Sequence, residues 1–488
     1  MPEDVPPAPT QEDPMTLSHE QLTADVRRDR EGTMLVLTSS DREALAPFEG
    51  DVREVGEGFV LEGPASTANA RALQAAIPAL RPGFVSEHRT SVGTGDRIGL
   101  ATAGQARALA AVGGDVFPVL AQQSIREMDR LGRSARGVMD EAVFGLVEAG
   151  WDRGFGADCD HIKSTEGIDR GLEAGFVMFT LDPGDYVQDV TAGATEEQAA
   201  ALPWDALEDT LEYTLARYEG LRLDVAGAEI VPSREDVITA AVKYGGAVAE
   251  AARLSRHLTE HAQHPVETEI AVDETAWQTS FFEHYYLATE LTRLGVRCFS
   301  FAPRYVDGFE KGLEFRGDVE ELRSNLAAHH AIGELFGGYK ISLHSGSDKF
   351  SIYPLAVEAT DGLVHLKTSG TSYLGALEVI AAHDPELFAE IWRISREAYG
   401  RAAASYQVSA QVEETPESLD GVDLQALIHQ EDGRQILHVG YGDSLTSTLA
   451  DGTPLVERFR AVIREHHEAY GDVLEPHLAR HLEAFARA

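Results

Sequence analysis

The stretch from Gly337 to Tyr353 reads GGYKISLHSGSDKFSIY, and its pattern is typical of a strand that ends in a functional loop. Apolar Ile341 and Leu343 alternate with polar neighbours, which is the period of two expected for a strand with one apolar face. The polar and charged run SGSDK follows His344 directly. Parallel α/β sheets present such loops at their carboxyl edge. The alternative is a buried strand with a hydrogen-bonded core histidine and an ordinary loop.

The same order of apolar strand, polar strand end and helix recurs on both sides of this stretch. Eight such units over about 300 residues predict a closed (β/α)8 barrel. A doubly wound open sheet is the alternative, but it needs fewer strands and usually a Gly-rich phosphate turn, and GTGDRIG does not match GxGxxG. The eight strand regions are GFVSEHRTSVGTGDRIGLAT, VFPVLAQQS, GFGADCDHIKS, FVMFTLDPGDYV, ETEIAVDETAWQ, RCFSFAPRYV, YKISLHSGSDK and LVHLKTSGTSYL.

Four segments are expected along the chain. Residues 1–16 are acidic and proline-rich without an apolar core, which predicts a disordered tail and not a secretory signal. Residues 17–82 suggest a small α+β lead-in, 83–400 the barrel, and 401–488 a mostly helical segment packed on it. Within that last segment, QILHVGYGDSL (Gln435 to Leu445) predicts an extra strand and turn near the barrel mouth, which would bring His438 close to the site.

The charge of the chain is strongly acidic, with 81 acidic against 41 basic residues and a formal net charge of -40. This excludes nucleic acid and anionic membranes as natural partners, because their binders need a basic face. Only six lysines accompany 35 arginines. We interpret this composition as halophilic adaptation, in which salt screens the repulsion between solvated carboxylates.

A soluble cytoplasmic protein is the expectation from the remaining composition. The apolar runs are far shorter than the roughly 20 residues that span a bilayer. Two cysteines, Cys159 and Cys298, form neither a disulfide framework nor a zinc-finger pattern. A homo-oligomer is compatible with the sequence but is not indicated by it.

Three histidines are predicted to face the barrel interior at the carboxyl ends of the strands. Alternation turns His161, His344 and His365 inward, with Lys163 and Lys367 on the same faces. Imidazoles and carboxylates that converge in this way suit a divalent cation such as Zn, Mn or Ni. No HExxH, CxxC or EF-hand pattern is present, so the metal site is inferred from convergence alone.

Other strand-end residues complete the predicted site. Asp160 is either a fourth ligand or a carboxylate that orients His161. The basic and hydroxyl side chains would bind a substrate with a carboxylate, a ketone and several hydroxyls. These candidate substrate contacts are Ser124, Lys163, Arg304, Lys349 and Lys367, and Asp182 is a further strand-end candidate.

Seven segments in order resemble the tagaturonate epimerase family, from about Gly93 to Leu445. They are GTGDRIGLAT, GWDRGFGADCDHIKS, AVDET, FAPRYVDGFEKG, YKISLHSGSDKFSIYP, VHLKTSGTSYLGAL and RQILHVGYGD. The resemblance implies a metal-dependent enzyme of hexuronate breakdown that interconverts D-tagaturonate and D-fructuronate. It also implies a small-molecule hexuronate as the partner.

That reaction inverts C4 of a 2-ketose, a carbon that is α to neither the ketone nor the carboxylate. Either retro-aldol cleavage or transient oxidation is therefore required, and we favour retro-aldol because no dinucleotide fingerprint is present. The candidate base is Glu269, Glu274 or Asp96. A metal-dependent ketose 3-epimerase or aldolase, and a non-catalytic sugar-binding barrel, remain the alternatives.

Overall fold

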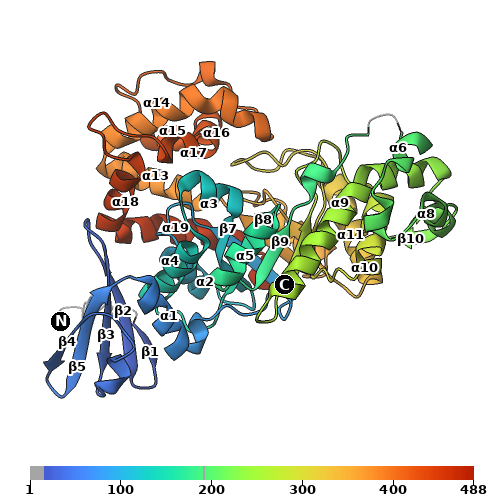
Figure 1. Ribbon diagram of the computed structural model, residues 1–488. Coiled ribbons are helices and arrows are strands. Elements are labelled where there is room, and N and C mark those ends of the chain that lie inside the picture. The colour runs from blue at the N-terminus through green and yellow to red at the C-terminus, as the bar shows by residue number, and fades with distance from the viewer. Residues whose placement is uncertain (1–15, 191–192, 488) are drawn as a thin grey trace, which may run out of the picture.

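Eight parallel strands close into a barrel, which confirms the predicted (β/α)8 fold (Figure 1). The computed structural model describes residues 16–190 and 193–487, so the tail expected over residues 1–16 lies outside the described residues except for its last position. The strands follow one another around the barrel in the order of the chain. They are β6 (Thr90–Gly95), β7 (Phe117–Ser124), β8 (Gly156–Ile162), β9 (Met178–Leu181), β12 (Glu267–Ala271), β13 (Ser300–Ala302), β14 (Lys340–Leu343) and β15 (Val364–Thr368).

Helices cover the outside of the barrel because the outward-facing strand residues are apolar. Ile341, Leu343, Val364 and Leu366 are all fully or almost fully buried beneath them. Several helices begin at a serine that caps the first turn, as Ser280 does for α10. The barrel helices are α2 (Thr102–Val112), α3 (Ile125–Leu131), α4 (Ala135–Glu148), α5 (Thr165–Ala174), α9 (Arg234–His261), α10 (Phe281–Arg293), α11 (Val319–Leu335), α12 (Tyr353–Ala359) and α13 (Thr371–His383).

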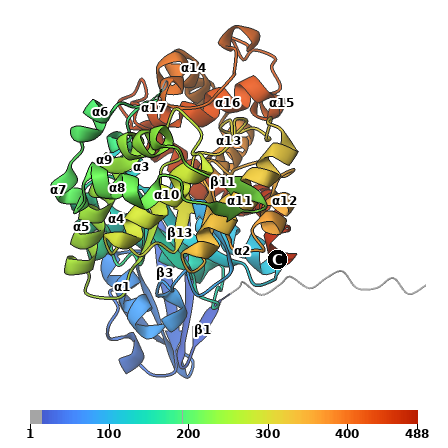
Figure 2. The ribbon, with the colours of Figure 1, turned by 90° about the vertical axis from the view of Figure 1, so that its right-hand side faces the viewer.

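The N-terminal segment is an antiparallel sheet with the strand order β1-β2-β3-β5-β4 and a following helix, α1 (Thr67–Ala76). Its strands are β1 (Leu17–His19), β2 (Leu22–Arg28), β3 (Thr33–Ser39), β4 (Asp51–Val55) and β5 (Gly58–Pro64), in agreement with the α+β segment expected there. Four of the five β4 residues are exposed. In both views this sheet lies below the barrel (Figures 1 and 2). A buried ion pair of 2.6 Å between Arg28 and Glu148 ties it to α4.

A small insertion lies between β9 and α9. It contains α6 (Glu196–Ala200), α7 (Trp204–Leu207), α8 (Leu211–Tyr218) and the hairpin of β10 (Leu223–Val225) and β11 (Ala228–Ile230). Short 3-10 helices occur at Glu43–Leu45, Pro78–Leu80, Gly184–Tyr186, Ala403–Ser405, Val412–Glu414 and Phe485–Arg487. None of the helices in the described ranges combines the length and the apolar character needed to cross a bilayer.

The C-terminal segment is helical and lies mostly above the barrel (Figure 2). Its helices are α14 (Pro385–Ala402), α15 (Leu424–His429), α16 (Glu431–Val439), α17 (Tyr441–Leu445), α18 (Leu455–Glu465) and α19 (His467–Leu482). The strand predicted over residues 435–445 was wrong, because this stretch forms most of α16 and all of α17. The alternation there was too short to decide, and Gln430 caps α16 by accepting a hydrogen bond from Gly433 N–H. α19 returns to pack on α2, where Leu474 contacts Gly104.

Candidate active site

β8 brings His161 to the barrel mouth, although not by simple alternation. Asp158 and Asp160 both point inward, because their carboxylates lie 2.7 and 2.8 Å from Lys367 Nζ. A regular strand would then turn His161 outward. Its φ of +49° and an irregular register with β9 turn the side chain back toward the interior. The predicted direction of His161 is therefore reached through a local distortion of the strand.

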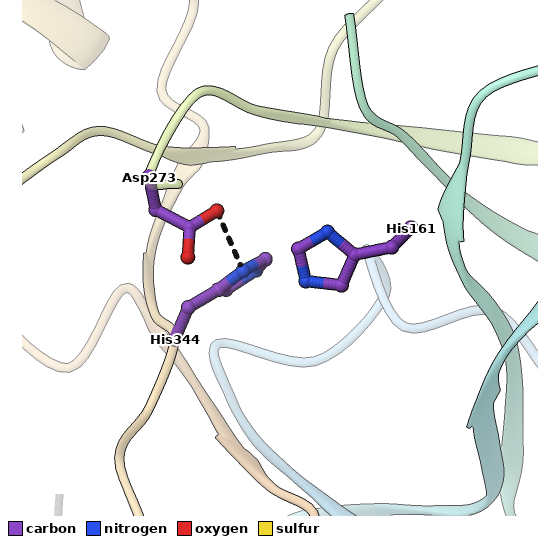
Figure 3. Close-up of side chains that lie close together, drawn as sticks. All are labelled: His161, Asp273 and His344. Carbon is purple, nitrogen blue, oxygen red and sulfur yellow. Dashed lines mark ion pairs between the residues drawn. The ribbon is translucent and has the colours of Figure 1, made fainter. Parts of the chain in front are cut away.

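Figure 3 shows His161, His344 and Asp273 pointing toward one another at the barrel mouth. One ligand atom from each residue lies within 4.8 Å of those of the other two. His344 Nδ1 is 3.1 Å from Asp273 Oδ1, while its Nε2 is 2.8 Å from Glu269 Oε1. His161 Nδ1 is 3.0 Å from Asp182 Oδ2. Each histidine thus has one nitrogen held by a buried carboxylate and leaves the other for the shared centre.

This arrangement fits a divalent cation. Metal-binding histidines commonly use their second nitrogen to bind a carboxylate, as His161 and His344 do here. Within the described residues, His344 Nδ1 has no hydrogen-bond partner of acceptable geometry, although Asp273 lies close by. Two imidazoles and one carboxylate that leave further positions open are typical of catalytic zinc, manganese or nickel sites. A divalent cation would therefore be held by His161, His344 and Asp273.

The electrostatics of the cluster favour added positive charge. Burial disfavours the imidazolium form of both histidines, but neighbouring carboxylates outweigh it. Asp160 and Asp182 raise the pKa of His161 well above its usual value. Asp273 likewise raises the pKa of His344 to about 9. The cluster therefore attracts either two protons or one divalent cation.

His365 does not belong to this cluster, which corrects the predicted set of three histidines. Its side chain points inward as expected, but it is fully buried and its Nδ1 lies 2.9 Å from Ser91 Oγ. Lys367, two residues further along the same face of β15, occupies the layer above it. Burial also lowers the pKa of His365 to about 3, so the ring is neutral. Alternation identified the correct face but not the depth.

The three candidate carboxylates for proton transfer have different surroundings. Glu269 is fully buried, and its Oε1 lies 2.8 Å from both His344 Nε2 and Lys367 Nζ. Asp96 accepts hydrogen bonds from the backbone N–H groups that follow β6, including those of Gly99 and Ala101. Glu274 lines the cavity beside the cluster. Of the three, Glu274 has the carboxylate that a bound substrate could reach.

Only some of the predicted substrate contacts line a cavity. Ser124 and Lys367 line the cavity at the cluster, and Arg304 lines a second cavity that adjoins it. Lys163 is 36% exposed and lies at the rim of the cluster, with its Nζ 2.6 Å from Asp185 and 3.6 Å from Asp182, the carboxylate that holds His161. Lys349 is buried and donates hydrogen bonds to main-chain carbonyls, including that of Leu313 at 2.6 Å. Its ammonium group stabilises a loop and is not directed at the cavity.

Two adjoining hollows meet at the cluster and share Asp273, Glu274, Lys311, His344, Ser345 and Tyr406. His438 lines the hollow at the cluster, near which the sequence placed it. Asp273, Arg97, Arg126, Lys311 and Tyr406 also line the cavity and were not assigned from the sequence. Asp273, Arg97 and Lys311 stand at or after strand ends in AVDET, GTGDRIG and FEKG, which is the signal that could have found them. Tyr406 comes from the C-terminal segment, and no local pattern marks it.

A second cluster, formed by Asp348, His477 and His481, has the composition of a metal site but is saturated by hydrogen bonds. His481 Nε2 accepts from Asp348 N–H at 2.9 Å, and its Nδ1 donates to the His477 carbonyl at 3.0 Å. The Asp348 carboxylate also lies 2.9 Å from Arg434 Nη2. These contacts fasten the loop after His344 to α16 and α19.

The closed parallel barrel with an acid-and-histidine centre at the carboxyl ends of its strands defines a (β/α)8 enzyme. A profile of the tagaturonate epimerase (UxaE) family matches residues 15–485. The tagaturonate/fructuronate epimerase of Thermotoga maritima is 35% identical over 467 residues, covering 95% of this chain and 94% of that protein. The chain belongs to the tagaturonate epimerase family.

Solved structures show the same relationship. Fructuronate-tagaturonate epimerase from Cohnella laeviribosi, in a complex with one glycerol, superposes with a TM-score of 0.87 at 30% identity. The match covers 96% of this chain and 95% of that one. The native form of the same enzyme gives a TM-score of 0.86. The likeness extends over the N-terminal sheet and C-terminal helices as well as the barrel.

Proposed function

We propose that this protein interconverts D-tagaturonate and D-fructuronate in hexuronate breakdown, by inverting C4 of the 2-ketose. The observation that carries the proposal is the cluster of His161, His344 and Asp273, found at the barrel mouth of a chain in this family. The relatives named above are tagaturonate/fructuronate epimerases, which supports the same substrates here. The acidic composition favours activity in a salty cytoplasm.

The activity is expected to depend on a divalent cation held by His161, His344 and Asp273. When bound, such a cation supplies Lewis acidity that polarises a ketone and stabilises the negative charge developing on its oxygen. Asp182 and Glu269 orient the two imidazoles by hydrogen bonds to the ring nitrogens that do not face the cation site. Lys367 holds Glu269 in turn, so the support of His344 extends into the barrel core.

The proposed chemistry is retro-aldol cleavage followed by re-closure. Glu274 removes the proton of the C4 hydroxyl, the C3–C4 bond breaks, and its electron pair moves onto the three-carbon ketone fragment. The other fragment is an aldehyde that carries the carboxylate. When this aldehyde turns and the bond re-forms on its opposite face, C4 is inverted. No oxidant or reductant is consumed.

The substrate carboxylate needs a basic partner in an otherwise acidic protein, and the cavity provides one. Lys311 lines both hollows, and its Nζ lies 2.8 Å from Ser345 Oγ with further N–H donors to spare. Arg304 lines the outer hollow. Arg126 forms a two-contact ion pair with Glu274, at 3.0 and 3.2 Å, so it positions the proposed base and is not available to the substrate carboxylate. We therefore assign the carboxylate to Lys311 and Arg304.

The decisive experiment incubates the protein, loaded with Mn²⁺ or Zn²⁺, with D-tagaturonate and separates the hexuronates by chromatography. D-fructuronate should accumulate to equilibrium, and chelator-treated protein should form none. A 3-epimerised product or net cleavage would identify a ketose 3-epimerase or an aldolase instead. Binding without turnover would identify a sugar-binding barrel.

A further inference from the structure

His438 is a buried histidine that the C-terminal segment inserts into the candidate active site. It lies on α16, its side chain is only 3% exposed, and it lines the same cavity as His161, His344 and Glu274. Its Nδ1 is buried without a hydrogen-bond partner among the described residues. This nitrogen lies against Gly312, whereas the ring as a whole lines the cavity, so a bound substrate can contact the imidazole there.

Two glycines make the space for this ring. A Cβ atom at Gly370, two residues beyond the end of β15, would clash with the ring of His438. A Cβ at Gly312 would lie 3.0 Å from Nδ1, and Gly312 has a φ of +74° that favours glycine. Both glycines therefore hold the main chain close to the imidazole. The barrel loops accommodate a residue that comes from outside the barrel.

α16 is fixed over the barrel, so the position of the ring is well defined. One turn before His438, Arg434 donates to the Gly312 carbonyl at 2.9 Å and pairs with Asp348. Its neighbour Gln435 donates to the Lys311 carbonyl at 3.2 Å. The His438 carbonyl itself accepts a hydrogen bond from Arg97 Nη1 at 3.4 Å. These contacts from three loops give the side chain a single docked position.

The surroundings keep His438 in its base form. Burial is the main cause that lowers the pKa of this imidazole well below its usual value, and Arg97, Lys311 and Arg434 add to it. Asp348 opposes them, but does not outweigh them. A neutral imidazole that lines the cavity is able to accept a proton from a substrate hydroxyl.

We infer that His438 is the second proton-transfer residue of the proposed epimerisation, serving the C4 hydroxyl of one epimer while Glu274 serves that of the other. This inference rests on the proposed function. Glu274 follows β12, whereas His438 covers the end of β15, three strands further around the barrel. The two residues therefore reach the cavity from different directions.

Inversion at C4 requires such a pair when the carboxylate end stays in place. If Lys311 and Arg304 hold that end, the aldehyde turns about the C4–C5 bond, and its oxygen swings from one side to the other. On cleavage of one epimer, His438 takes the hydroxyl proton as the C3–C4 electron pair leaves. On closure to the other epimer, the new alkoxide takes a proton from Glu274. Each turnover moves one proton between the two residues, and exchange with solvent restores it.

The test runs the reaction from its two halves. Dihydroxyacetone and racemic tartronate semialdehyde are incubated with the metal-loaded protein, and the two hexuronates are quantified by chromatography. The wild-type protein should make both epimers. His438→Asn keeps the size of the ring edge but not its basicity. This variant should still form one epimer, but the amount of the other epimer should fall at least 10-fold. Interconversion of the purified hexuronates should fall at least 100-fold.

Controls separate catalysis from folding. His429→Asn replaces a half-exposed histidine on the neighbouring α15 and should behave as wild type. Thermal melting and metal content should show that His438→Asn is folded and loaded, and His438→Gln provides a second variant if it is not. An unchanged epimer ratio in a folded variant would overturn the inference and leave the activity standing. The inference would also be overturned if the wild-type protein interconverted the hexuronates but did not condense dihydroxyacetone with tartronate semialdehyde. If the wild-type protein did neither, the proposed function itself would be contradicted.

Discussion

Metal binding to the candidate centre should release protons, and the number follows from the structure. At pH 7 without a cation, His161 and His344 both carry a proton, because nearby carboxylates raise the pKa of the first well above its usual value and that of the second to about 9. A metal ligand must be unprotonated. Titration of metal-free protein with Zn²⁺ at pH 7 should therefore release about two protons per site.

The same arithmetic predicts the pH dependence of affinity. Since two protons compete with one cation, the apparent Kd should fall about 100-fold for each pH unit between pH 6 and 8, so that affinity rises with pH. The slope should lessen as the pH approaches the pKa of His344, about 9. Burial raises the pKa of Asp158 to about 7, so this carboxyl group also titrates between pH 6 and 8. Asp158→Asn removes this titration and therefore measures how much Asp158 contributes to the pH dependence of metal affinity.

Isothermal titration calorimetry in buffers of different ionisation enthalpy measures the released protons directly. His344→Asn should bind more weakly and release about one proton, because only His161 then exchanges a proton for the cation. His429→Asn, at an exposed position outside the cluster and its cavity, should match the wild type. Zero proton release at pH 7, or the same release from wild type and His344→Asn, would refute this account of the cluster.

Four further outcomes are expected. The melting temperature should rise from low to molar salt, because screening relieves the repulsion of a net charge of -40, and a flat curve would remove halophily as the explanation of the composition. Burial lowers the pKa of Lys340 to about 7, from an ordinary value of 10.5. The unfolded chain then binds the extra proton between these values, so stability should rise across that window by on the order of 5 kcal/mol. Lys340→Met should flatten this slope in urea unfolding, and an unchanged slope would contradict the assignment. Lys311→Met should raise KM for uronates at least 10-fold but leave KM for the matching neutral ketose nearly unchanged, and equal effects on both would place the carboxylate elsewhere. Deuterium at C4 should be fully retained in the product with little kinetic effect, whereas a large primary effect would favour hydride transfer.

Local sequence patterns determined the architecture of this protein. Eight apolar segments that each precede helical sequence define the strands of the barrel, because period-two and period-3.6 patterns depend only on neighbouring residues. The same logic predicted that the site lies at the carboxyl ends of the strands. It also correctly predicted that His344 and Lys367 face the interior, because β14 and β15 pair in regular register.

Tertiary structure alone decided which of these residues form the centre. His365 and Lys367 share one face of β15 but lie in different layers, and alternation carries no information about depth. His161 reaches the cluster because the strand is distorted at a φ of +49°, which no pattern marks. Lys349 turns to main-chain carbonyls of the loop after β13, which packs beside its own loop. The sequence placed His438 near the barrel mouth but on a strand, whereas it enters from helix α16, whose docking depends on the packing of segments far apart in the chain.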